Sequence, residues 1–343
     1  MTKKSTGSNR VNIRDIANVA GLSISTVSRV LNGKADQYRI GKKSQDRVKK
    51  IANEMNYVPN QFAANLKSGK SKTIALMVPS LNNPFFAEIA SRVNSEIRKY
   101  GYVTIIVDSN EDQEIEKKEL SQLLSRNIEG LIIVPCGNQK DHINILHEKG
   151  IPIVCLDRYF KELKIPYVST DNYKGAYLAT KYLLDLGHRH IACIQGIKES
   201  NTNKLRVSGF KYALQEADIK NSILIGDDFT TKNGYVQTKV LLKHEKRPTA
   251  VLALSNTIAM GCMKALKETN ICVPRDISLI TFDDHPYLEF LATPLTCVEQ
   301  PVKRISKLAV KFIFSILTGK KIKQDQILLM PTMKTRLSVR KLN

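Results

Sequence analysis

The spacing of apolar residues changes near Thr73, and this change divides the chain into two kinds of structure. Before that point apolar residues recur every three or four positions, which is typical of amphipathic helices. After it, short apolar runs alternate with amphipathic stretches, which predicts βαβ units and a mostly parallel sheet. Seven or more units favour two Rossmann-like lobes, with Tyr167–Asn172 crossing from the first to the second. The predicted strands are Ile74–Pro79, Val103–Asp108, Gly130–Pro135, Pro152–Asp157, His190–Gly196, Ala250–Ser255 and Ile277–Phe282.

The stretch Val11–Asn32 predicts two short helices joined by a tight turn. Asn12 and Ser23 are each able to cap a helix, and Gly21 permits the turn between the helices. The second helix then has an apolar face and an opposite open face, formed by Val27, Val30 and Leu31 and by Ile24, Ser25, Ser28, Arg29 and Asn32 respectively. This pattern predicts a helix-turn-helix whose second helix fits the major groove of DNA. A pair of ordinary helices with a solvated face is the alternative.

A third helix is predicted after the polar, basic loop Gly33–Lys43. Ser44 is able to cap it, and its apolar positions have helical spacing at Val48, Ile51, Ala52 and Met55. The resulting three-helix headpiece ends near Tyr57. The next segment, Asn60–Lys67, has room for barely two helical turns, and so short a helix needs a partner to be stable.

At these residues the chain resembles the lactose/galactose-repressor (LacI/GalR) family of transcription regulators. The resemblance is carried by the run Ser23–Gly33, by Tyr57-Val58-Pro59-Asn60, Asn83-Pro84-Phe85-Phe86, Asp283-Asp284 and Gln300-Pro301. It implies a headpiece at residues 1–58, a hinge helix at 59–71 and an effector-binding core, like the periplasmic binding proteins, at 72–343. It also implies that lobe one spans about 72–170 and 301–328, and lobe two about 171–300 and 329–343.

The expected partner of the headpiece is double-stranded operator DNA, bound by a homodimer or a larger oligomer on a pseudo-palindromic site. Ser25, Thr26 and Arg29 should face the groove, where Arg29 suits guanine or phosphate. The resemblance implies that Leu66 wedges into the minor groove, as apolar side chains do when they kink DNA. The DNA-binding candidates are Asn12, Ser23, Ile24, Ser25, Thr26, Ser28, Arg29, Asn32, Tyr57, Asn60 and Leu66.

Polar residues at strand ends predict a small polar ligand between the lobes, because open α/β sheets bind ligands beyond the carboxyl ends of their strands. The effector-binding candidates, placed mainly by the resemblance, are Phe85, Phe86, Asp157, Thr202, Arg206, Phe229, Asn256 and Asp283. The phenylalanines are equally able to be core residues, and Thr202 to cap a helix. A sugar or sugar derivative is the expected effector, although Asn256 stands where the family more often has Asp.

The net charge of +21 is unevenly distributed. Residues 1–72 carry 15 Lys and Arg against 4 Asp and Glu, which concentrates about half of the excess in the segment expected to face DNA. Binding through such charges weakens steeply with added salt. No run approaches 18 apolar residues and the N-terminus has no apolar stretch of a secretory signal, so we expect a cytoplasmic protein without a membrane span.

The sequence indicates no catalytic chemistry. The segment Gly69-Lys70-Ser71 lacks the earlier glycine of a phosphate-binding loop, and His188 and His190 lack further metal ligands nearby. We expect the six cysteines to be reduced structural thiols. We therefore expect no cofactor, no metal and no enzyme. The alternatives left open are a regulator controlled by a protein partner, and a cytoplasmic sugar-binding protein or enzyme with the same core.

Overall fold

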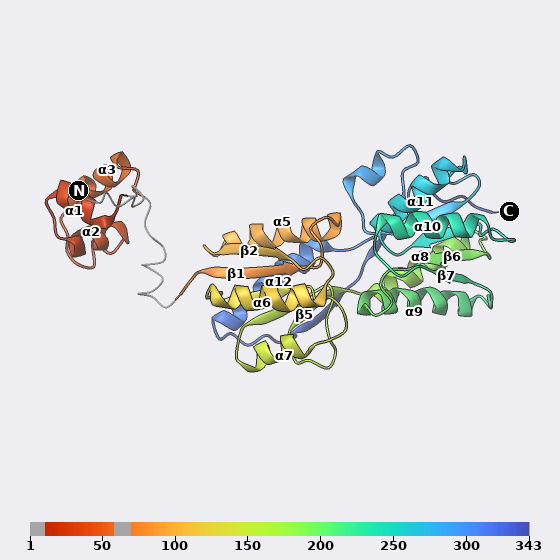
Figure 1. The fold of residues 1–343 in the computed structure, drawn as a ribbon, viewed down its shortest axis with the longest axis horizontal. Helices are drawn as coiled ribbons and strands as arrows, with labels where there is room; N and C mark the ends of the chain where they lie inside the picture. The colour runs from red at the N-terminus through yellow and green to blue at the C-terminus, as the bar shows by residue number, and fades with distance from the viewer. Residues whose placement is uncertain (1–10, 58–69, 343) are drawn as a thin grey trace, which may run out of the picture. The chain divides into compact units, whose positions relative to one another are not determined.

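The computed structural model describes residues 11–57 and 70–342. Contacts divide the chain into two compact units, Met1–Ser71 and Lys72–Asn343, and each is described by itself. The first unit contains the helices α1 (Ile13–Ala20), α2 (Ile24–Leu31) and α3 (Lys42–Glu54), shown in Figure 1. Residues 59–69 of the expected hinge segment, 59–71, lie outside the described residues.

The caps predicted for the first two helices are confirmed. The Asn12 side chain accepts the N–H groups of Arg14 and Asp15, and Asp15 in turn accepts the Asn12 N–H, which completes a capping box. Gly21 ends α1 in the left-handed conformation at φ +61°. Ser23 caps α2 by accepting the N–H of Thr26. The two helices and the turn between them are therefore encoded locally.

The third helix differs from the prediction at its start. It begins at Lys42, with Gly41 at the cap position and no side-chain cap, so the assignment of Ser44 as the cap is wrong. Ser44 instead lies in the first turn, where its N–H bonds the Gly41 carbonyl. Its Val48, Ile51 and Ala52 do pack with the buried face of α1 and α2, which gives the headpiece one small core.

The second unit contains two six-stranded sheets with helices on both faces. The first sheet has the strand order β11-β5-β4-β3-β1-β2. Its strands are β1 (Thr73–Val78), β2 (Val103–Asp108), β3 (Gly130–Ile133), β4 (Ile153–Leu156), β5 (Tyr167–Thr170) and β11 (Gln326–Leu329), and its helices are α5 (Pro84–Arg98), α6 (Gln113–Ser125), α7 (Asp141–Glu148) and α12 (Val302–Leu317).

The second sheet repeats this arrangement with the order β12-β10-β9-β8-β6-β7. Its strands are β6 (Ile191–Ile194), β7 (Ile223–Ile225), β8 (Ala250–Ala253), β9 (Ser278–Phe282), β10 (Thr296–Glu299) and β12 (Thr332–Lys334). Its helices are α8 (Asn172–Asp185), α9 (Asn201–Glu216), α10 (Thr231–Leu242) and α11 (Asn256–Glu268), followed by the 3-10 helix η1 (Pro286–Glu289). Since β4 and β9 hold the same place in the two orders, residues just after them occupy equivalent positions.

All strand pairs are parallel except β10 with β12, which is antiparallel. The seven predicted strands all exist, with small differences at their ends, and the expectation of two Rossmann-like lobes is confirmed. The strands β5, β7, β10, β11 and β12 were not assigned as strands from the sequence. Most of them carry polar residues within three or four positions, as β5 (YVST) and β10 (TCVE) do, so no continuous apolar run marks them, in contrast to the equally short β3, β4, β6 and β8.

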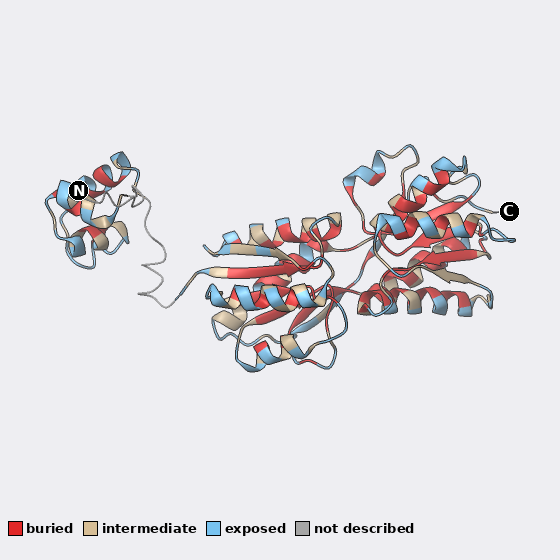
Figure 2. Cartoon of the chain, viewed as in Figure 1, coloured by how far each residue is buried: buried red, intermediate tan, exposed pale blue. Residues whose placement is uncertain are grey.

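Alternation along β1 shows how each lobe buries both faces of its sheet. Ile74, Leu76 and Val78 pack with α5 and α12 on one face, and Ala75 and Met77 pack with α6 and α7 on the other. Figure 2 shows the resulting concentration of buried residues in the strands of both sheets. Such continuous apolar strands are typical of parallel sheets covered on both faces.

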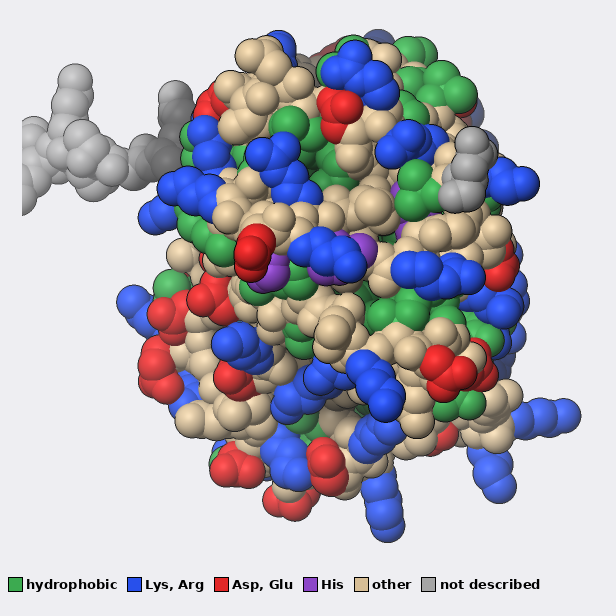
Figure 3. Space-filling view, turned by 90° about the vertical axis from the view of Figure 1, so that its right-hand side faces the viewer, with side chains coloured by type: hydrophobic (Ala, Val, Ile, Leu, Met, Phe, Trp, Pro, Cys, Tyr) green, Lys and Arg blue, Asp and Glu red, His purple; other side chains and the backbone are tan. Residues whose placement is uncertain are grey.

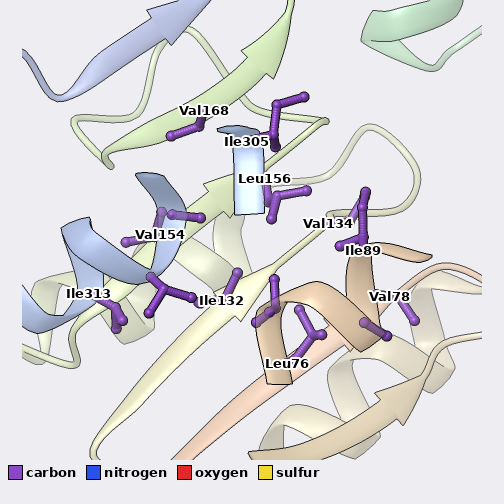
Figure 4. Close-up of a cluster of buried hydrophobic side chains, with 14 of the residues drawn as sticks. Leu76, Val78, Ile89, Ile132, Val134, Val154, Leu156, Val168, Ile305 and Ile313 are labelled. Atoms are coloured by element: carbon purple, nitrogen blue, oxygen red, sulfur yellow. The ribbon is translucent and has the colours of Figure 1, made fainter. Parts of the chain in front are cut away.

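The chain returns from the second lobe to the first through α12. Ile305 and Ile313 of this helix lie among Leu76, Ile132 and Val154 of the first sheet, as Figure 4 shows. Three segments therefore connect the lobes: the chain after β5, the chain after β10 and the chain between β11 and β12. In the described part of the chain no helix is both long and apolar enough to span a membrane.

Candidate DNA interface and effector cleft

The open face of α2 has the exposure that the sequence predicts. Val27 and Val30 are buried, whereas Ile24, Ser25 and Arg29 are exposed. Ile24 is 46% exposed and takes no part in the headpiece core, so its apolar side chain is open on this face. The face therefore combines hydroxyl, guanidinium and apolar groups, the set with which proteins contact base edges and thymine methyl groups.

Hydroxyl groups at the start of α2 bond one another. The Ser23 hydroxyl lies 2.9 Å from that of Ser25 and 2.8 Å from that of Thr26. At the other end, the Asn32 amide donates to the Ser28 carbonyl at 2.7 Å. These local bonds hold the short polar side chains in place on the surface of the helix.

The remaining DNA-binding candidates have different positions. Asn12 is exposed, but its side-chain oxygen is occupied by the capping box of α1. Tyr57 is half-buried against the headpiece core. Asn60 and Leu66 lie outside the described residues, so their expected roles remain predictions.

A cavity lies between the lobes of the core, and seven of the eight effector candidates line it. Lobe one contributes Phe85 and Phe86 from the start of α5 and Asp157 from the end of β4. Lobe two contributes Thr202 and Arg206 from α9, Phe229 before α10 and Asp283 after β9. The cavity has a volume of about 20 Å³, which is enough for about one water molecule.

Arg206 is the most extensively held of these side chains. It is buried, its Nε donates to Asn172 Oδ1 at 2.7 Å, and its Nη1 donates to the Leu254 carbonyl. Its Cζ also lies 4.0 Å from the centroid of the Phe282 ring. Burial lowers the pKa of Arg206, although Asp283 and Asp157 oppose this change. The guanidinium is therefore aimed into the cleft by contacts from three different elements.

Asp157 and Asp283 occupy equivalent positions after β4 and β9. Both have left-handed backbones, at φ +63° and φ +70°, which non-glycine residues adopt uncommonly and often at functional sites. Burial raises the pKa of Asp157 to about 6, against the effect of Arg206 and Arg158. Its Oδ1 is buried without a hydrogen-bond partner among the described residues, which leaves an acceptor available to a ligand.

Asp283 is connected to the segments that join the lobes. The Gln300 amide donates to Asp283 Oδ1 at 2.6 Å, and Thr170 donates its hydroxyl to the same Gln300 side chain. All three side chains are buried. Since Thr170 ends β5 and Gln300 follows β10, this chain of bonds joins a cleft carboxylate to two of the interlobe connections.

The structure adds cleft residues that sequence reasoning missed, namely Asn83, Arg158 and Ser255. Arg158 directly follows Asp157, and Glu111 holds its guanidinium through two bonds of 2.7 Å. Burial lowers the pKa of Arg158, but Glu111 outweighs this and raises it. The Arg158 Cζ lies 5.6 Å from the ring of Phe86 and 5.8 Å from that of Phe229, so it stands between the lobes. The sequence feature that could have identified Arg158 as a cleft residue is its position directly after the strand-end residue Asp157.

Asn256 differs from the other candidates. It is fully buried and does not line the cavity, although the neighbouring Ser255 does. Its two side-chain polar atoms have no hydrogen-bond partner within the described residues. Asp171 and Asp284, also at strand ends, serve the fold: Asp171 caps α8, and Asp284 pairs with Lys334 and Arg336.

Two of the histidines, His188 and His190, make contacts within the fold. His188 is buried and bonds Thr249 Oγ1 and the Arg340 carbonyl, and His190 bonds the Lys246 carbonyl. No group of three or more metal-ligating side chains is found across residues 11–57 and 70–342. Cys136, Cys155 and Cys193 are free and buried.

A helix-turn-helix unit that precedes a two-lobed α/β core with a polar cleft defines the class of DNA-binding transcription regulators controlled by a small molecule. Two family descriptions match the chain: "Bacterial regulatory proteins, lacI family" at residues 12–60, and "Periplasmic binding proteins and sugar binding domain of LacI family" at residues 71–306. The chain belongs to the lacI family of bacterial regulatory proteins.

Relatives that match over most of this chain support this membership. The ribose operon repressor of Haemophilus influenzae is 33% identical over 95% of this chain and 98% of its own. The crystal structure of the Lac repressor dimer bound to operator and the anti-inducer ONPF matches with a TM-score of 0.87 at 26% identity, covering 97% of this chain and 100% of that one. A regulator from Enterococcus faecium with bound ribose matches with a TM-score of 0.72 at 29% identity, covering 79% of this chain and 100% of that one.

Proposed function

We propose that this regulator represses transcription by binding a pseudo-palindromic operator as a homodimer or larger oligomer, and that a neutral sugar in the interlobe cleft controls this binding. The observation that carries the proposal is the convergence of polar and aromatic side chains from both lobes on one cavity. Membership of the family indicates the class of activity. The side chains that line the cleft indicate which kind of effector binds there.

The cleft chemistry favours a polyhydroxylated ligand. Asp157 and Asp283 accept hydrogen bonds from hydroxyl groups, and Arg206 donates to them. Phe86 and Phe229 offer ring faces, one from each lobe, for the apolar face of a sugar ring. The cleft contains both positive and negative groups, and the charge of Arg158 is neutralised by its ion pair with Glu111. This balance favours a neutral ligand, and the ribose bound by the Enterococcus faecium neighbour fits the same description.

Effector binding requires the cleft to change. A cavity of about 20 Å³ is far below the few hundred Å³ of a typical ligand site, so side chains or lobes must separate to admit a sugar. The hydrogen bonds from Asp283 through Gln300 to Thr170 would carry such a change to the interlobe connections. Control of DNA binding then needs only that the effector has different affinities for the two arrangements.

On the DNA side, we propose that the open face of α2 reads the major groove through Ser25, Thr26 and Arg29. Ser23, Ile24, Ser28 and Asn32 border this face, and Asn12, Tyr57, Asn60 and Leu66 remain candidate contacts. The domain boundaries implied by the resemblance, 1–58, 59–71 and 72–343, belong to the same proposal. Figure 3 shows Lys and Arg spread over one end of the core with acidic and uncharged residues between them, unlike the concentrated charge of residues 1–72.

We propose that the core pairs with the core of a second copy of the chain. Val103 on the edge strand β2 is 64% exposed, and a pseudo-palindromic operator requires two headpieces. The similar Lac repressor structure is a dimer bound to operator. We further propose that the regulator acts in the cytoplasm, where its DNA is, and that it does not transform its effector.

The experiment begins with selection of duplexes from a random library by the purified full-length chain. We expect a palindromic consensus whose binding survives random competitor DNA at moderate ionic strength. Failure to enrich any sequence, with or without sugars present, would contradict the DNA-binding half of the proposal.

The effector half is tested with D-ribose, other neutral sugars, their phosphates and purine bases. We expect a neutral sugar to raise the melting temperature of the core and to change operator affinity, and its phosphate to do neither. The matched control is Arg206→Lys, which keeps the charge but loses the forked donors and should weaken sugar binding. A response to phosphates alone would overturn the neutral-sugar assignment, and recovery of a converted sugar would reveal an enzyme. If no small molecule acts, capture of a protein that alters operator affinity would support the partner-controlled alternative.

A further inference from the structure

The loop between α2 and α3 contains an aromatic side chain that lies against Arg29. The Arg29 Cζ is 3.9 Å from the centroid of the Tyr38 ring, a cation–π contact. No hydrogen bond or ion pair of the Arg29 guanidinium is found within the described part of the headpiece. The ring therefore supports the cation while its N–H groups remain available to another molecule.

The position of Tyr38 is set by the loop around it. Ala35 is buried in the headpiece core, and the Ile40 N–H bonds the Ala35 carbonyl at 3.0 Å. Gln45 of α3 is buried and donates to Asp36 Oδ1 at 3.0 Å and to the Ile40 carbonyl at 2.9 Å. These anchors lie on both sides of Tyr38 in the chain, so its backbone has little freedom.

The start of the loop is also tied to α2. The Lys34 N–H bonds the carbonyl of Arg29 itself at 2.8 Å, and Gly33 supplies the left-handed turn at φ +70°. Arg29 and Tyr38 are thus connected through a short, hydrogen-bonded segment. Their contact is a product of the headpiece fold.

We propose that Tyr38 is a positioning residue for DNA recognition, which holds the Arg29 guanidinium in the direction that a base edge requires. This inference rests on the proposed contact of Arg29 with the operator. An exposed arginine has many rotamers, and fixing one of them on binding costs conformational entropy. A ring that already favours the binding rotamer reduces that cost at one base pair, and it leaves general attraction to phosphates unchanged.

The test compares Tyr38→Ala and Tyr38→Phe in the full-length chain, using the duplex selected by the unaltered chain and a random duplex. Tyr38→Ala should lower operator affinity by about fivefold per headpiece, which a cation–π contact between exposed groups allows. Affinity for the random duplex and the dependence of binding on salt should stay the same. Tyr38→Phe keeps the aromatic face and should bind as the unaltered chain does.

The decisive measurement is a double-mutant cycle with Arg29→Ala. Tyr38→Ala should cost nothing further in the Arg29→Ala background, because the side chain that it positions is gone. Arg39→Asn is the matched control in the same loop, since it removes a charge and keeps a residue that tolerates the φ of +52°. This control should weaken both duplexes alike.

Three outcomes would overturn the inference: an equal cost of Tyr38→Ala in both backgrounds, an equal loss on the random duplex, or tighter operator binding by Tyr38→Ala. Unchanged thermal unfolding of the headpiece excludes a general structural effect. Failure of the unaltered chain to select any duplex contradicts the proposed function instead, so the two failures are distinguishable.

Discussion

Two arginines, one in the headpiece and one in the core, lie against aromatic rings at nearly the same distance. Arg29 is 3.9 Å from the ring of Tyr38, and Arg206 is 4.0 Å from the ring of Phe282. Arg29 is exposed, whereas Arg206 is buried and bonded to Asn172 and a main-chain carbonyl. The same kind of contact, an arginine against an aromatic ring, therefore occurs in two opposite environments.

The difference is consistent with the partner that we propose for each arginine. An exposed guanidinium costs the fold little and depends on its partner to exclude water, which a DNA groove does over a large area. A buried guanidinium must be stabilised before any ligand arrives, here by Asp157 and Asp283 as well as by its hydrogen bonds. Such a site suits a small ligand that completes an existing set of contacts.

The prediction with the largest expected effect concerns Arg206, the buried arginine of this comparison. Arg206→Met should reduce the free energy of unfolding of the core by about 4 kcal/mol near pH 7, because Asp157 and Asp283 lose a nearby cation and Asn172 loses a donor. Urea denaturation measures this. Arg98→Met, an exposed arginine on α5, is the control and should change stability by less than about 0.5 kcal/mol. Equal stability of the two variants would contradict the structural role of Arg206.

The titration of Asp157 should make the stability of the core depend on pH. Its pKa of about 6 in the folded chain exceeds that of an unfolded aspartate, so the folded state binds the extra proton between about pH 4 and pH 6. Stability contributed by this group is present below that window and falls as the pH rises through it, by about 3 kcal/mol in all.

The measurement compares the unaltered chain with Asp157→Asn by urea denaturation at several pH values. The difference between their unfolding free energies should change across this window and be constant above it. A constant difference throughout would show that burial does not raise the pKa of Asp157.

The exposed arginine should affect binding and leave stability intact. Arg29→Ala is expected to weaken binding to the selected operator about 30-fold, within the 1–3 kcal/mol of a good base contact. Gel-shift titration measures this, with Arg47→Ala on α3 as a control that removes the same charge elsewhere. If the two variants lose the same affinity, on the operator and on the random duplex alike, Arg29 contacts phosphates and not a base.

The smallest effect concerns the cap of α1. Asn12→Ala should lower the local stability of this helix by about 1 kcal/mol, seen as faster amide hydrogen exchange in Ile13–Ala20. Asn12→Asp keeps an acceptor for the same N–H groups and should retain protection. If instead Asn12→Ala lowers operator affinity without changing exchange, Asn12 acts mainly as a DNA contact.

Local patterns in the sequence were sufficient for most of the architecture. The spacing of Val27 and Val30, the Gly21 turn and the caps at Asn12 and Ser23 predicted the helix-turn-helix, because each depends on neighbours within four residues. The continuous apolar runs predicted their strands for the same reason. The start of α3 was misjudged because Ser44 had the right residue type, although the helix had already begun at Lys42.

What the sequence by itself determined is the series of local elements and, with the family resemblance, seven side chains of the cleft. Only the tertiary structure decided that Arg158 joins them and that Asn256 does not line the cavity, since both outcomes depend on how two lobes meet. It also decided the short strands β11 and β12, which gain their hydrogen bonds from β5 and β10 far away in the chain. The contact of Tyr38 with Arg29 belongs to the same group, because Gln45 on another helix holds the loop in place. Contacts between distant residues leave no periodic pattern in the sequence, and for that physical reason only the folded chain shows them.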